Sequence, residues 1–163
     1  MDHSVSIEVQ LASTVTSVPD ESEIQSWVAE AVHELAVQYD CEVSIRIVDE
    51  EEGRDLNKRY RNIDKATNVL SFPADNVSLS DLASDIPCLL GDIVICGPIV
   101  EREADAQHKA PAAHWAHMLV HGTLHLLGQD HEDDVQAEEM ESIEIRILER
   151  RGLSDPYALP REV

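Results

Sequence analysis

The spacing of apolar residues along the chain switches between a period of two and a helical period, and these switches delimit the expected elements. Alternation of apolar and polar residues, or a short apolar run bounded by Gly or Pro, predicts a strand. The strands are expected at residues 5–11, 43–47, 67–72 and 93–95. Pro73 is expected to stop the third strand, and the polar stretch 74–87 is expected to be a flexible loop.

Helical periodicity accounts for most of the remaining chain. The helices are expected at residues 19–35, 50–61, 98–108, 111–127 and 133–150. This order of elements favours an α+β fold, in which about five helices pack on one small, mixed, four-stranded sheet. A length of 163 residues suits a single domain, 1–163, with enough chain to form a core.

The helix expected at 111–127 is apolar on most sides, which is typical of a buried central helix. Its polar exceptions include His114, His117, His121 and His125. At about 100° per residue, these four histidines fall within a sector about 80° wide. A single histidine in a core is usually a packed, hydrogen-bonded side chain, whereas several at ligand spacing indicate a metal site at the end of this helix.

The spacing around the end of the helix favours a metal site. His121 and His125 are four residues apart, so their imidazoles can share one ion. Gly128 would end the helix and bring back His131 as a third ligand, a spacing that metzincin peptidases use. Three imidazoles with an open fourth position suit one catalytic zinc ion per chain, although imidazole also binds nickel, copper and iron. Gly122 stands where HExxH peptidases have their catalytic Glu, which argues against peptide hydrolysis.

The net charge of −21 opposes general binding of nucleic acid, because a polyanion is repelled by such a surface. Five of the 12 Lys and Arg nevertheless lie between residues 54 and 65. They are Arg54, Lys58, Arg59, Arg61 and Lys65. This basic segment is either a solvated helix face or a phosphate-binding surface. In the second case, an Arg beside the metal would stabilise charge on a phosphoryl oxygen.

Other features of the sequence indicate a cytoplasmic protein. The three cysteines form no CxxC pair and are expected to be reduced, buried thiols. The first residues lack the basic and apolar regions of a secretory signal, and no apolar run is long enough to span a membrane.

Three segments of the chain carry distinctive motifs. They are AHWAHMLVHGTLHLLGQDH at 113–131, LNKRYRNIDKATNVLSFP at 56–73 and LLGDIVIC at 89–96. The first resembles the signature of the YbeY family of bacterial metal-dependent endoribonucleases, and the other two are similar to two further blocks of that family. Ala66 departs from the pattern, because the family commonly has Pro before this Thr, and the change should loosen the entry to the third strand.

The resemblance implies that His121, His125 and His131 bind a metal ion, usually assigned as zinc, and that Arg61 is the important basic residue for RNA cleavage. It also implies that His114 lines the site, where we expect it to assist catalysis. The implied substrate is single-stranded ribosomal RNA. The implied role is maturation of the 3′ end of the small-subunit (16S) RNA, together with ribosome quality control.

The expected partners are ribosomal RNA and the small ribosomal subunit or its assembly factors, with no membrane or DNA partner. Two alternatives stay open at this point. The chain is a metallohydrolase acting on another substrate, or it is a non-enzymatic ribosome-assembly factor whose metal ion only stabilises the fold. An acidic protein could dock on basic ribosomal proteins in the second case.

Overall fold

The computed structural model describes residues 4–74 and 88–157, so the loop expected at 74–87 lies outside the described residues except for Ala74. The strands are β1 (Val5–Ala12), β2 (Cys41–Val48), β3 (Val69–Pro73) and β4 (Cys88–Cys96). The helices are α1 (Glu21–Glu34), α2 (Glu50–Arg61), α4 (Gly97–Ala106), α5 (Pro111–Leu126) and α6 (Asp134–Arg150). The expected α+β class is confirmed, and the helices begin and end within two residues of the prediction.

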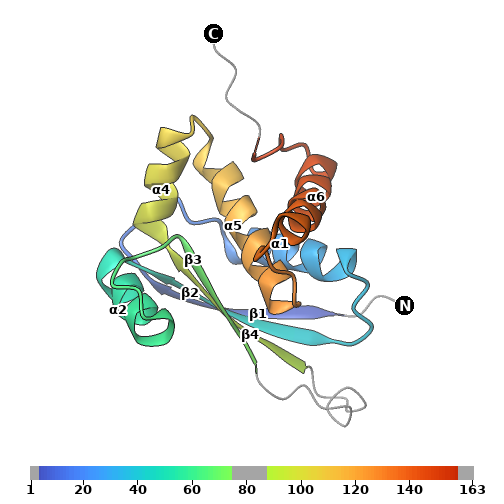
Figure 1. The fold of residues 1–163 in the computed structure, drawn as a ribbon, viewed down its shortest axis with the longest axis horizontal. Helices are drawn as coiled ribbons and strands as arrows, with labels where there is room; N and C mark the ends of the chain where they lie inside the picture. The colour runs from blue at the N-terminus through green and yellow to red at the C-terminus, as the bar shows by residue number, and fades with distance from the viewer. Residues whose placement is uncertain (1–3, 75–87, 158–163) are drawn as a thin grey trace.

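The four strands form one mixed sheet in the order β1-β2-β4-β3. β1 pairs with β2 and β2 with β4 in parallel, whereas β3 runs antiparallel to β4 at the edge. The parallel pairs have helical connections, because a crossover needs more chain than a hairpin turn. β3 and β4 thus place residues 69–73 beside 91–95, next to the end of the sheet where α2 and α4 begin (Figure 1).

Most of the core lies between one face of the sheet and the helices α1, α5 and α6. α5 is the central helix, in contact with α1, α4, α6 and the sheet (Figure 1). Trp115, Leu119 and Leu124 on this helix have no exposed surface. A smaller apolar cluster on the other face includes Val94 and Cys96, against which Leu56 of α2 packs. The expectation of a buried central helix is confirmed.

All four strands differ from their predicted bounds, and in β3 and β4 the sheet explains the difference. β3 includes Pro73, which was expected to stop it, and Pro73 pairs with Gly91. Proline is tolerated there because β3 is an edge strand, where a residue can lack its N–H without breaking a central ladder. β4 begins at Cys88, five residues earlier than the apolar run 93–95 indicates, because Gly91 and Asp92, which precede that run, are themselves paired with the neighbouring strands.

Two further expectations concern the chemistry of the chain as a whole. The three cysteines are buried and free, as expected. In the described part of the chain, no helix combines the length and apolar character needed to cross a membrane.

Candidate metal centre

Three histidines converge where α5 ends. His121 and His125 lie one turn apart, and the chain turns back after Gly128, whose φ of +94° suits glycine. Ligand atoms of His121, His125 and His131 all lie within 4.8 Å of one another. The side chain of His131 is 56% exposed and that of His121 is 20% exposed, so one side of the cluster faces solvent. The predicted juxtaposition of these three residues is what the structure shows.

The donor atoms of this cluster fit a metal ion. The Nε2 atoms of His121 and His125 face each other at 3.1 Å. This contact is a hydrogen bond only if one of the two nitrogen atoms is protonated. Burial, with the neighbouring imidazoles of His121 and His131, lowers the pKa of His125 to about 4. His125 is therefore neutral at physiological pH, which is the form that binds metals. Three imidazoles that converge with one side open are typical of catalytic zinc sites.

Arg61 reaches the same place from another element. A groove of about 660 Å³ is lined by Arg61 together with His121, His125 and His131. The Arg61 side chain at the end of α2 donates from Nη2 to the carbonyl of Ser71 on β3 at 2.9 Å. The hydroxyl of Ser71 donates to the carbonyl of Gly122 on α5 at 3.0 Å. Two hydrogen bonds thus connect the arginine to the helix that holds the histidines.

The other two arginines of the basic segment are less available for an anion. Arg54 forms an ion pair with Asp64 at 2.7 Å, and Arg59 pairs with Asp55 at 3.2 Å. Within residues 4–74 and 88–157, no carboxylate pairs with Arg61. The groove therefore combines an arginine that lacks a carboxylate partner with the histidine cluster.

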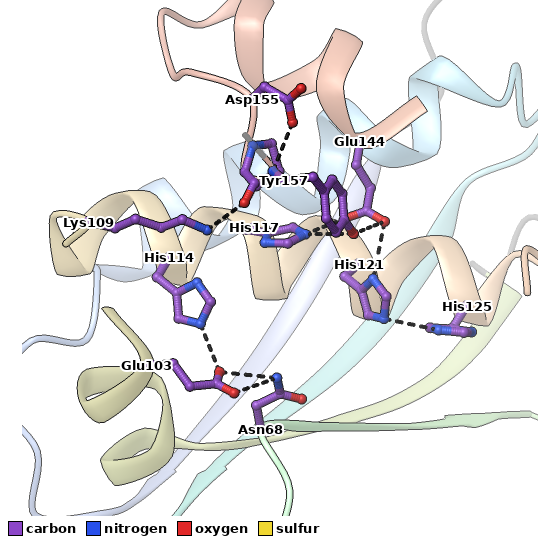
Figure 2. Close-up of polar contacts among 11 residues, drawn as sticks. Asn68, Glu103, Lys109, His114, His117, His121, His125, Glu144, Asp155 and Tyr157 are labelled. Atoms are coloured by element: carbon purple, nitrogen blue, oxygen red, sulfur yellow. Dashed lines mark hydrogen bonds and ion pairs between the residues drawn. The ribbon is translucent and has the colours of Figure 1, made fainter. Parts of the chain in front are cut away.

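His114 does not line this groove. It is buried, and its Nε2 is 2.8 Å from Oε1 of Glu103 on α4, which also accepts from the side-chain amide of Asn68 (Figure 2). His114, Glu103 and Asn68 thus form a second polar cluster. Among the described residues, no contact of His114 supports the expected catalytic role, which stays a prediction.

A buried carboxylate that the sequence analysis missed lies behind His121. Glu144 on α6 has no exposed surface, and its side chain contacts His117, His121 and Tyr157 (Figure 2). The sequence does contain a signal for it, because Glu144 lies between Ile143 and Ile147 on the apolar face of its helix. Tyr157 lies beyond that helix, and no periodic pattern indicates its position.

The packing of Gly122 explains the missing peptidase residue. A Cβ at this position would lie 2.9 Å from Cγ2 of Ile93 and 3.2 Å from Cγ2 of Val69. Real Cβ atoms do not approach a neighbour so closely, and Ile93 is fully buried. The HExxH glutamate therefore has no room here, because α5 crosses the sheet at this glycine.

Comparison with known proteins agrees with the geometry. A family model described as Endoribonuclease YbeY matches residues 7–152. The endoribonuclease YbeY of Cellvibrio japonicus is 51% identical over 151 residues, which cover 93% of this chain and 82% of that protein. The protein of the same name from Pseudomonas syringae pv. syringae is 53% identical over 152 residues, covering 93% and 87%.

The fold also has a counterpart among solved structures. The solution structure of a protein from Thermotoga maritima superposes with a TM-score of 0.52 and 24% sequence identity. The match covers 93% of this chain and 99% of that one. At this level of identity, the likeness supports the fold alone.

Proposed function

The chain belongs to the YbeY family of endoribonucleases, and from that premise we propose that it is a zinc-dependent endoribonuclease that cleaves single-stranded ribosomal RNA. One observation carries the proposal: Arg61 and the three histidines line the same groove although they come from distant parts of the chain. We further propose that its substrate includes the 3′ end of the small-subunit RNA precursor and that it also takes part in ribosome quality control.

His121, His125 and His131 would hold the metal ion. A bound divalent ion supplies Lewis acidity at the scissile phosphate and lowers the pKa of a water molecule. Arg61 binds a non-bridging oxygen of the phosphate through its guanidinium, and its bond to Ser71 aims it across the groove. Its fixed positive charge stabilises the additional negative charge that develops on the phosphate in the transition state.

The open groove favours a single strand. Its walls combine polar and apolar residues from α2, β3, α5 and the loops beside them, so a phosphodiester can approach with both neighbouring nucleotides attached. Ile63 is 52% exposed at this groove and offers an apolar contact for a base. The surrounding acidic surface repels RNA elsewhere, so productive binding is confined to the groove.

The test is cleavage of a small-subunit RNA 3′ precursor by purified protein, with and without a chelator. We expect cleavage by the wild type, which the chelator, His125→Ala and Arg61→Ala abolish. Arg59→Ala is the matched control, because it removes an exposed arginine of the same helix that is already paired with Asp55. The ends of the products would show whether water or the ribose 2′-hydroxyl attacks.

The proposal fails if wild type and His125→Ala cut the RNA at the same background rate while both are folded. In that case, the assembly-factor alternative would lead. Binding of the small subunit by the wild type, with no dependence on Arg61, would then support it. A casein-cleavage assay on the same preparations tests the remaining hydrolase alternative, which the packing of Gly122 disfavours.

A further inference from the structure

We propose that Glu144 is a positioning residue for the metal centre and that its carboxylate fixes the imidazole of His121 so that Nε2 faces the ion. The inference rests on the proposed function only in taking His121 as a metal ligand. The proposal rests on the hydrogen bonds that His117, His121 and Tyr157 form with the carboxylate of Glu144.

Burial of this carboxylate is unusual. Among the described residues, Glu144 is the acidic side chain that is fully removed from solvent, and it lies on the apolar face of α6. An isolated carboxylate in a core is strongly destabilising unless hydrogen bonds compensate its lost hydration. A buried carboxylate therefore needs hydrogen-bond donors around it, and the identity of those donors indicates its role.

Glu144 has three donors around it. His117 donates from Nε2 to Oε2 at 2.5 Å, and His121 donates from Nδ1 to Oε1 at 3.2 Å. The hydroxyl of Tyr157 is within 3.0 Å of both carboxylate oxygens. All three contacts bring a donor to a carboxylate oxygen, so the side chain of Glu144 acts as an acceptor toward each of them.

The carboxylate of Glu144 decides which nitrogen of His121 has the proton. Because a carboxylate oxygen accepts the hydrogen bond, Nδ1 of His121 is the nitrogen that donates in this contact. Nε2 then has a free lone pair, and it is the Nε2 atom that faces Nε2 of His125 at 3.1 Å. A carboxylate behind a histidine in this way both orients the ring and makes it a better donor to a metal.

The same contacts exclude Glu144 as a direct ligand. Oxygen atoms of Glu144 lie near nitrogen atoms of His117 and His121, so these residues also form a possible ligand group by distance alone. Their atoms are already hydrogen-bonded to one another, and His117 and Glu144 are both buried. The structure therefore assigns this group to support of the solvent-facing cluster.

Tyr157 extends the support to the segment after α6. Its hydroxyl contacts Glu144, and its ring packs edge-on against His117 with centroids 5.2 Å apart. Lys109 donates from Nζ to the carbonyl of Pro156 at 2.9 Å, which fastens this segment to the start of α5 (Figure 2). Truncation before Tyr157 should therefore affect the metal centre as well as this end of the chain.

The experiment measures affinity for Zn²⁺ alone, by competition with a chromogenic chelator, for the wild type and three variants. Glu144→Gln keeps the volume but replaces the anion by a weaker, neutral acceptor that also presents an NH₂ group. We expect its affinity for Zn²⁺ to fall about 10- to 100-fold. Tyr157→Phe should weaken binding in the same direction by less. Glu138→Gln, on the exposed side of the same helix, should leave the affinity unchanged.

A spectroscopic measurement separates positioning from simple loss of fold. ¹⁵N chemical shifts of the histidine side chains in the metal-free wild type report the tautomer of His121, and we expect the proton on Nδ1. A proton on Nε2 would overturn the proposal even if Glu144→Gln did not fold. A folded Glu144→Gln that binds Zn²⁺ as the wild type does would overturn it as well.

These outcomes are distinct from those of the nuclease test. A wild type that binds Zn²⁺ through His121 but cuts no RNA would refute the proposed function and leave the role of Glu144 intact. A wild type that binds no Zn²⁺ would refute both. Loss of affinity in Glu144→Gln, with the expected tautomer in the wild type, supports the proposal whatever the substrate is.

Discussion

Gly122 and Gly53 are helical glycines for which replacement by alanine should have opposite effects. In either helix, alanine is favoured over glycine by about 1 kcal/mol, because glycine loses more backbone entropy on folding. At Gly122, the new methyl group would lie 2.9 Å from Ile93 and 3.2 Å from Val69. At Gly53, its nearest neighbours are Val48 at 3.6 Å and Cys96 at 3.7 Å, which are ordinary contacts.

The magnitude follows from these distances. Overpacking a core costs about 1–3 kcal/mol, and we take the upper part of that range because Cγ2 of Ile93 is held at a branched carbon in a fully buried side chain. After the helix preference is subtracted, Gly122→Ala should lower the free energy of unfolding by about 1–2 kcal/mol. Gly53→Ala should raise it by about 0.5–1 kcal/mol.

Urea denaturation of both variants in the presence of a chelator measures these changes without a contribution from bound metal. A third variant tests the cause: Ile93→Leu removes the methyl group at the branch point, so adding it to Gly122→Ala should recover part of the loss. Stabilisation by Gly122→Ala, or no coupling between the two substitutions, would show that α5 can move away from the sheet and that the argument from packing is wrong.

Three further predictions concern other parts of the molecule. Gly91→Ala should cost about 2–5 kcal/mol in thermal or urea unfolding, since Gly91 has a φ of +145° and a Cβ would lie 2.3 Å from the carbonyl oxygen of Phe72; a cost below that of Gly122→Ala would contradict this. The hydrogen bond from His114 lowers the pKa of Glu103, so the stability that it provides is present above its usual pKa of 4.5 and is lost as the pH falls through the lower folded value. The free energy of unfolding of Glu103→Gln should therefore fall less steeply between pH 5 and pH 3 than that of the wild type. Denaturation curves at several pH values measure this, and an equal dependence on pH in both proteins would refute the assignment. RNA binding by filter retention should weaken with salt with a logarithmic slope of roughly −1 to −2, because few phosphates meet a cation in the groove; a slope that implies ten contacts would contradict binding that is confined to the groove.

Local patterns predicted the elements and the histidine cluster because both depend on residues near one another in the chain. Helical spacing places His121 and His125 on one side of α5, and Gly128 gives the turn that returns His131. The strand of Pro73 shows the limit of such patterns, since a proline is excluded from a central strand but accepted at an edge. Edge and centre are properties of the sheet, which no local pattern determines.

The contacts between distant groups around the histidines depend on how the elements pack. Arg61 reaches the groove because β3 lies between α2 and α5, and Ser71 on that strand forms hydrogen bonds with both neighbours. Glu144 contacts His121, although the two residues are 23 positions apart, because α6 packs its apolar face on α5. The clustering of His121, His125 and His131 could be predicted from the sequence, because their spacing is that of one helix and one turn. The packing of separate elements determined the groove and the buried carboxylate, because such contacts exist only after the chain has folded.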